Sequence, residues 1–246
     1  MAKKATVGKV RASLRTIEAG GLRAELVRTR RRSVSLQLLP DLGLLLRAPV
    51  NASDEYLRDF LQRREDWVRK HRARLEALRA EDPGPIWSAG GEVPFLGRKL
   101  LLDVKDGSRR SARLDTEGIA VVVPDPADSR AVRAAVERLY AREAAKRFPP
   151  LLDACLERAA PHRLPRPELR LRAMRSRWGS CDPVKKIVTL NTRLLRFRPE
   201  IIEYVIMHEL SHLRHRGHDA RFYAFLERLC PEWKSMRRQL AGVFLD

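Results

Sequence analysis

The sequence has few cysteines and no long apolar run, and each shortage excludes a class of protein. Its 246 residues include three Cys, at positions 155, 181 and 230, which are widely spaced and form no CxxC pair. This odd, scattered set excludes a disulfide framework and favours a reducing cytosol. No apolar stretch approaches the roughly 18 residues of a membrane-spanning helix, and the basic N-terminus lacks the apolar segment of a secretory signal. We therefore expect a cytoplasmic protein without membrane contact.

Acidic residues are scarce relative to basic ones. The chain has 50 Lys and Arg against 31 Asp and Glu, which gives a formal net charge of +19. Residues 1–32 contain ten basic and two acidic residues, and residues 158–198 contain twelve basic and two acidic residues. Such a positive field attracts polyanions, including nucleic acid and nucleotides. A soluble protein with arginine-rich faces would have the same composition, so both interpretations stay open.

Short alternating apolar stretches dominate the first half of the chain. SVSLQLL and IAVVVP have the two-residue period of strands, and a helix is expected from about residue 54 to residue 80. Pro124-Asp125-Pro126 indicates a break in regular structure. We therefore predict an α+β protein with a flexible basic lead-in over residues 1–20, a β-rich N-terminal domain with one long helix over residues 21–124, and a second domain over residues 125–246.

The second half is predicted to be mainly helical, with a small sheet. A helix that begins near Ser129 should be interrupted at Pro149-Pro150, because proline cannot donate a backbone hydrogen bond. ELRLRAM and KIVTLN have the pattern of strands. A long helix should then run from Pro199 until Gly217 stops it.

The most informative motif is His208-Glu209-Leu210-Ser211-His212, an HExxH pattern on the helix predicted after Pro199. Residues four apart lie one above the other on a helix, so both imidazoles can bind one Zn²⁺ ion. Glu209 lies about 100° around the axis, where its carboxylate can act on water at the metal rather than bind the metal. The spacing thus predicts a zinc site with Glu209 as general base.

A catalytic zinc site usually needs a third protein ligand. His218 follows His212 by six residues, the spacing found in longer HExxH motifs, and Gly217 before it should adopt a left-handed conformation at the helix end. The alternatives are His215, whose expected role is to support a ligand or to be solvated, and the downstream acids Glu227 and Glu232. Asp219 could orient a ligating imidazole or simply cap the next helix.

The stretch from Met174 to Leu240 resembles the C-terminal core of the YgjP-like metal-dependent hydrolases, relatives of the SprT-like zinc metallopeptidases. The motifs that carry the resemblance are Arg177–Cys181, Ile187–Asn191, Tyr204–Leu213, His218 with Phe222, and Pro231-Glu232-Trp233-Lys234. The segment RRRSVSLQLLPDLGLLLRAP also resembles the family, so the likeness covers most of the chain. It implies a zincin-like helical core with a small sheet and an HExxH helix, with His208, His212 and His218 as ligands and Glu209 as the catalytic residue.

Five residues near the motif are weaker candidates. Arg175 and Arg177 could bind phosphate or carboxylate, because guanidinium suits bidentate anion contacts. Trp178 could form the floor of a substrate groove or belong to the core. Cys181 is expected to be a packed residue rather than a nucleophile, since no nearby base is visible. Asn191, at a strand end, should satisfy a turn.

Together the residues predict a hydrolase with one Zn²⁺ ion per chain and HExxH-type metallopeptidase chemistry, in which Glu209 activates a metal-bound water. Two alternatives remain. The first is a metal-dependent nucleoside triphosphate pyrophosphatase, an activity that the resemblance includes. The second is a nucleic-acid-associated, protease-like module, since the SprT-like relatives act on proteins bound to DNA. The expected substrate is a peptide or a nucleotide, and nucleic acid is a further expected partner of the basic surface.

Overall fold

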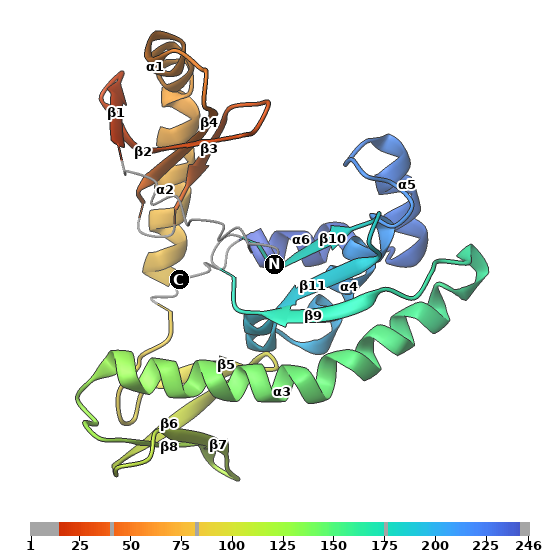
Figure 1. The fold of residues 1–246 in the computed structure, drawn as a ribbon. Coiled ribbons are helices and arrows are strands. Elements are labelled where there is room, and N and C mark those ends of the chain that lie inside the picture. The colour runs from red at the N-terminus through yellow and green to blue at the C-terminus, as the bar shows by residue number, and fades with distance from the viewer. Residues whose placement is uncertain (1–14, 40–41, 82–83, 175–176, 242–246) are drawn as a thin grey trace, which may run out of the picture. The chain divides into compact units, whose positions relative to one another are not determined.

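The computed structural model describes residues 15–39, 42–81, 84–174 and 177–241, and the chain divides into two compact units. Unit 1 is Met1–Pro83 and unit 2 is Gly84–Asp246. Both contain helices and small mixed sheets (Figure 1), which confirms the prediction of an α+β fold. In the described part of the chain, no helix is both long enough and apolar enough to cross a bilayer.

Unit 1 is a four-stranded sheet with two helices. Its elements are β1 (Arg15–Ala19), β2 (Leu22–Thr29), β3 (Ser35–Leu38), β4 (Leu44–Pro49), α1 (Asp54–Gln62) and α2 (Glu65–Glu81). The strand order is β1-β2-β4-β3. Alternate residues of β2 and β4 are buried, and Leu57 and Leu61 of α1 complete the core from the same side.

Unit 1 differs from the sequence prediction at two points. Residues 15–19, expected within the flexible lead-in, form β1, because Ile17 is buried and Gly20-Gly21 turns the chain back with positive φ angles. The remainder of the lead-in lies outside the described residues. The single helix expected over residues 54–80 is divided in two, since the N–H of Arg64 bonds to the carbonyl of Leu61, only three residues back.

Unit 2 begins with a second four-stranded sheet. Its strands are β5 (Glu92–Phe95), β6 (Arg98–Asp106), β7 (Ser111–Leu114) and β8 (Gly118–Val123), in the order β5-β6-β8-β7. The helix α3 (Ser129–Arg158) packs against this sheet, and the two share one hydrophobic core. The structure therefore places the chain division at residue 83 rather than at the break predicted near residue 124.

Helix α3 passes through Pro149 and Pro150, where the sequence predicts an interruption. Each proline removes one backbone hydrogen bond, and Figure 1 shows that the helix changes direction part-way along its length. Phe148 and Leu152 on either side of the pair are buried in the core. Burial of the flanking turns thus outweighs the local cost of the two prolines.

The remainder of unit 2 holds a three-stranded sheet and three helices. Its elements are β9 (Glu168–Arg172), β10 (Gly179–Asp182), β11 (Ile187–Asn191), α4 (Pro199–Ser211), α5 (Ala220–Leu229) and α6 (Trp233–Ala241). The sheet order is β10-β11-β9, so β10 is an edge strand. Helix α4 contacts β10, β11, α5 and α6. This helix is therefore central to the second unit.

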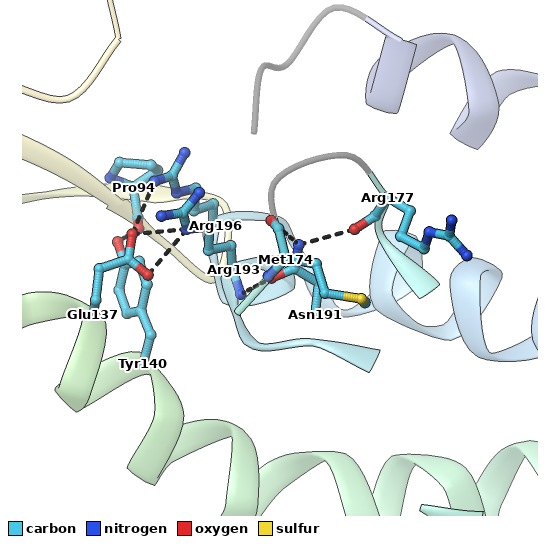
Figure 2. Close-up of polar contacts among 8 residues, drawn as sticks. All are labelled: Pro94, Glu137, Tyr140, Met174, Arg177, Asn191, Arg193 and Arg196. Carbon is cyan, nitrogen blue, oxygen red and sulfur yellow. Dashed lines mark hydrogen bonds and ion pairs between the residues drawn. The ribbon is translucent and has the colours of Figure 1, made fainter. Parts of the chain in front are cut away.

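A polar cluster connects the end of β11 to α3. Glu137 of α3 accepts hydrogen bonds and ion pairs from Arg193 and Arg196, with an Arg193 Nε to Glu137 Oε1 distance of 2.8 Å (Figure 2). Both arginines lie in the short 3₁₀ helix η2 (Thr192–Arg196) and both are buried. The hydroxyl of Tyr140, one turn further along α3, donates to the carbonyl of Pro94 in β5. These contacts fix the start of α4 relative to the rest of unit 2.

Candidate metal centre

Helix α4 is buried around most of its circumference, and His208 is one of its few partly exposed residues. Pro199 occupies its first turn, where a missing N–H has no cost. The apolar residues Ile202, Ile206 and Leu210 are fully buried, whereas His208 and His212 are partly exposed. Packing of the buried residues of α4 therefore orients the two motif histidines without any contribution from a metal.

The three predicted histidine ligands come together in the structure. The Nε2 atoms of His208 and His218 are 3.0 Å apart, and all three residues offer ring nitrogens within 4.8 Å of one another. Ligand nitrogens at 2.0–2.1 Å from a tetrahedral zinc ion are separated by about 3.3 Å. The arrangement fits a zinc ion with little movement. Metal binding itself stays a prediction.

The environment favours the neutral, metal-binding form of His208 and His218. Burial, together with the charges of His212 and His218, lowers the pKa of His208 to about 3. Burial also lowers the pKa of His218, in the same direction as the charge of His212. Neither ring therefore needs to lose a proton at neutral pH before it can bind a metal ion.

The backbone of His215 contacts the ring of His212. Its carbonyl oxygen lies 3.0 Å from Nδ1 of His212, so the proton of His212 resides on Nδ1 and Nε2 is left for the metal. The His215 ring instead lies 5.5 Å from the ring of Phe225. The imidazole of His215 thus packs near Phe225, and it is the backbone carbonyl that contacts His212.

The chain reaches His218 by a route that the sequence does not predict. Helix α4 ends at Ser211, where the N–H groups of His212, Leu213 and Arg214 bond to carbonyls three residues back. The expected extension to Gly217 is wrong, and Gly217 does not have a positive φ. An irregular segment carries the chain to His218 instead.

The next helix fixes the third histidine. Asp219 caps α5, since its carboxylate accepts a hydrogen bond from the N–H of Phe222 at 2.9 Å. The buried Phe222 ring lies within 5.0 Å of the rings of His208, His212 and His218. Phe222 thus forms the wall behind the triad. The sequence signal for it is an aromatic residue one turn into the helix that follows the last histidine.

The two acidic alternatives are not part of this cluster. Among the described residues, the group able to hold a metal consists of the three histidines. Glu227 is exposed and pairs with Lys234 at 3.3 Å, and Glu232 is exposed. The geometry thus favours His218 as the third ligand.

Glu209 is buried beside the triad, in contact with strand β10. Its side chain lies so close to Gly179 that a Cβ atom there would be 2.5 Å from Oε1 and 2.7 Å from Cγ. Burial raises the pKa of Glu209 to about 8, while the charge of Arg177 acts in the opposite direction. The carboxylate is therefore held in one place by α4 on one side and by the backbone of β10 on the other.

We expect Gly179→Ala to impair catalysis without loss of metal. The added methyl group must displace the Glu209 carboxylate, and a shift of about 1 Å in a catalytic group can lower activity about 100-fold. The matched control is Gly217→Ala, because a Cβ atom at Gly217 meets no atom within 4 Å. Steady-state rates and metal content measured for both variants provide the test. Normal rates for a folded Gly179→Ala protein would contradict the proposed contact.

The arrangement of three histidines and one buried glutamate can be compared with known families. A model of the YgjP-like metallopeptidase domain matches residues 32–242. The chain belongs to the YgjP-like family. The matching model describes a metallopeptidase domain, so the chain is a metal-dependent hydrolase, as the sequence predicts.

Comparison with solved structures gives a more limited result. The metallopeptidase zymogens of Pyrococcus abyssi abylysin and Methanocaldococcus jannaschii jannalysin are each 21% identical to this YgjP-like chain. Both alignments cover 37% of it, and they cover 88% and 95% of the other chains, with TM-scores of 0.33 and 0.31. The likeness thus concerns little more than a third of this chain. No curated protein matches it.

In this YgjP-like domain, Asn191 holds the backbone of Met174 and of Arg177, which precede β10. The buried Asn191 amide donates to the carbonyls of Met174 and Arg177 at 2.9 and 3.0 Å (Figure 2). Its oxygen accepts from the N–H groups of Met174 and Arg193. Asn191 thus satisfies a turn, as the sequence indicates, and it fixes the backbone that leads into Gly179.

The weaker candidates have different positions. Arg177 is exposed, and its guanidinium points away from Asn191 (Figure 2), whereas Arg175 lies outside the described residues. Trp178 is half-buried and packs edge-to-face on Phe197, with ring centroids 4.9 Å apart. Burial and the neighbouring charges of Glu209 and Asp182 raise the pKa of Cys181 to about 12. Its thiol therefore stays protonated, as expected for a packed cysteine.

Two cavities meet beside His208 and Glu209. One has a volume of about 520 Å³ and extends along β10 to Pro183, Val184 and Arg216. The other, of about 360 Å³, extends past Tyr204 to Arg237 and Leu240. Their shared lining residues are Arg177, Gly179, His208 and Glu209. Substrate bound in both cavities would thus cross the candidate metal site.

Proposed function

We propose that this YgjP-like protein is a zinc-dependent peptidase in which His208, His212 and His218 hold the metal and Glu209 is the general base. The observation that carries the proposal is the position of Glu209. Its carboxylate is buried beside the three converging imidazoles and borders both cavities of the cleft. A purely structural metal site would have no use for a buried carboxylate that does not bind the metal.

Different residues of the chain would have different roles in hydrolysis. A bound zinc ion would polarise the scissile carbonyl and make water more acidic. Glu209, whose ionised form would be favoured by the positive charge of a bound metal ion, could then accept the proton of the attacking water and deliver it to the leaving amine. The backbone of Gly179 lies against that carboxylate and would limit its movement during the reaction. His215 keeps His212 in the metal-binding tautomer.

Strand β10 offers a way to bind the peptide. In the described part of the chain it pairs with β11 on one side alone, so its other edge can accept an extended substrate strand. Its residues from Gly179 to Cys181 line the larger cavity. The peptide backbone would then pass beside Glu209.

Metal removal provides the test of this function. We expect the chelator-treated protein to lose the cleavage of unstructured, casein-like peptides and to regain it when Zn²⁺ is added back. Peptide fragments identified by mass spectrometry would report the activity. Absence of zinc-dependent peptide cleavage, with zinc-dependent hydrolysis of nucleoside triphosphates instead, would contradict the proposal.

The other candidate function is the zinc-dependent hydrolysis of nucleoside triphosphates. Arg177, Arg216 and Arg237 line the cleft and could bind a polyphosphate as well as a carboxylate. Binding of nucleic acid to the basic stretches and a cytoplasmic location stay predictions. A steep loss of nucleic-acid binding with salt would support the former.

A further inference from the structure

The charges that line the cleft are almost entirely of one sign. Arg177 borders both cavities, Arg216 lines the larger one and Arg237 lines the smaller one. The acidic residue that lines either cavity is Glu209, which is buried and assigned to catalysis. A ligand that spans the cleft therefore meets exposed positive charge at the centre and on both sides.

Arg177, Arg216 and Arg237 form no ion pair with the residues that the structure describes. Among the described residues, none of the three has a carboxylate oxygen within 4.0 Å. Arg237 instead hydrogen-bonds to the hydroxyl of Tyr223 at 3.4 Å, and its guanidinium lies 5.9 Å from the centre of that ring. By contrast, Arg158, Arg166 and Arg198 of the same unit each pair with an acidic side chain. The cleft arginines thus remain available to a ligand.

The two outer arginines lie in opposite directions along the cleft. The smaller cavity reaches Tyr204, one turn before His208 on α4, and Trp178, just before β10. The larger cavity reaches His212, one turn after His208, and Cys181, further along β10. Arg237 and Arg216 therefore serve different ends of a substrate that passes over Glu209.

From these positions we infer that the cleft selects peptides with carboxylate side chains on both sides of the scissile bond, bound by Arg237 at one end and by Arg216 at the other. This inference rests on the proposed peptidase function and names its substrate class. Arg177, at the junction of the cavities, adds attraction for the acidic segment as a whole. Charge-assisted hydrogen bonds from guanidinium to carboxylate give both affinity and geometric selectivity.

The test uses the full-length, zinc-loaded protein and matched peptides. One peptide carries Glu on both sides of the cleaved bond, and its partners carry Gln, which has the same shape without the charge, on one side or on both. We expect each Glu-to-Gln change in the peptide to lower kcat/KM by about three- to tenfold, as for partly exposed charge pairs. The difference should shrink as salt is raised, because salt screens exposed charges.

Variants of the protein test which arginine determines the preference for Glu on each side of the cleaved bond. Arg216→Gln should remove the preference for Glu on one side of the bond, and Arg237→Gln should remove it on the other side. Arg228→Gln is the matched control, since Arg228 is exposed, lies on α5 and lines neither cavity. It makes the same change in net charge and should alter neither preference.

The possible results distinguish a wrong substrate class from a wrong assignment of peptidase activity. Equal cleavage of the Glu and Gln peptides by the wild-type protein would overturn the substrate class and leave the peptidase function intact. A preference that Arg228→Gln weakens as much as Arg216→Gln would assign it to overall charge and overturn the inference. Failure to cleave any of the peptides with zinc present would overturn both the inference and the proposed function.

Discussion

Glu209→Gln is expected to lower peptide hydrolysis by about 10²–10⁴-fold while the bound metal is retained. Gln has nearly the same size as Glu, so it can occupy the space between α4 and the backbone of Gly179. It cannot accept the proton of the attacking water. The loss should therefore appear in kcat rather than in metal content, and steady-state kinetics with metal analysis of the same preparation measures both.

The control for this experiment is Glu227→Gln. Glu227 is an exposed acid of α5 that pairs with Lys234, so the same chemical change is made outside the cleft. Its rate should stay close to that of the wild-type protein. Near-normal turnover by a metal-replete Glu209→Gln protein would exclude Glu209 as the general base.

Replacement of His208, His212 or His218 by Ala is expected to weaken metal binding by more than about 100-fold. Loss of a group that merely orients a ligand typically costs about 10- to 100-fold, and loss of a ligand itself should cost more. Competition with a coloured chelator measures the affinity of each variant. Activity should fall with metal content and should recover partly at high zinc concentration.

His215→Ala is the control for the three histidine variants. The backbone carbonyl of His215 contacts His212, and its ring packs near Phe225, so removal of the ring should leave metal affinity nearly unchanged. Full zinc occupancy in His218→Ala together with zinc loss in His215→Ala would show that the wrong histidine had been assigned as the third ligand.

The core of the site can be read from the sequence because it depends on local geometry. His208, Glu209 and His212 occupy one helix, and the four-residue spacing alone places the two imidazoles on one face. The position of Gly179 against Glu209 cannot be found in this way, since the two residues are 30 positions apart and meet through the packing of β10 on α4. The RWGSC motif marks the region but not the contact.

The path of the chain from Ser211 to His218 could not be predicted from the sequence either, for a different reason. The residues after Ser211 have the composition of a continuing helix, yet α4 ends there and Gly217 is not left-handed. Convergence of three imidazoles, with Phe222 behind them, determines where the chain must go. That tertiary arrangement outweighs the helical preference of a short segment.

The fold was predictable where periodicity was strong. The alternating strands follow their pattern and α4 begins at Pro199 as predicted, whereas α3 continues through Pro149 and Pro150 because its flanking residues are buried. Likewise, residues 92–123 resemble the N-terminal strands in pattern but share a core with α3. The local pattern of apolar residues thus predicts whether a segment is a strand or a helix, but long-range packing determines which elements it contacts.

Anomalous X-ray diffraction at the zinc absorption edge, from crystals of the zinc-loaded protein, tests the central claim most directly. We expect one strong anomalous peak per chain, within about 2.0–2.1 Å of a ring nitrogen from each of His208, His212 and His218. The carboxylate of Glu209 should lie beside this peak without binding it. A peak coordinated by Glu209 or by Glu227, or a strong peak elsewhere with none between the three histidines, would contradict the account.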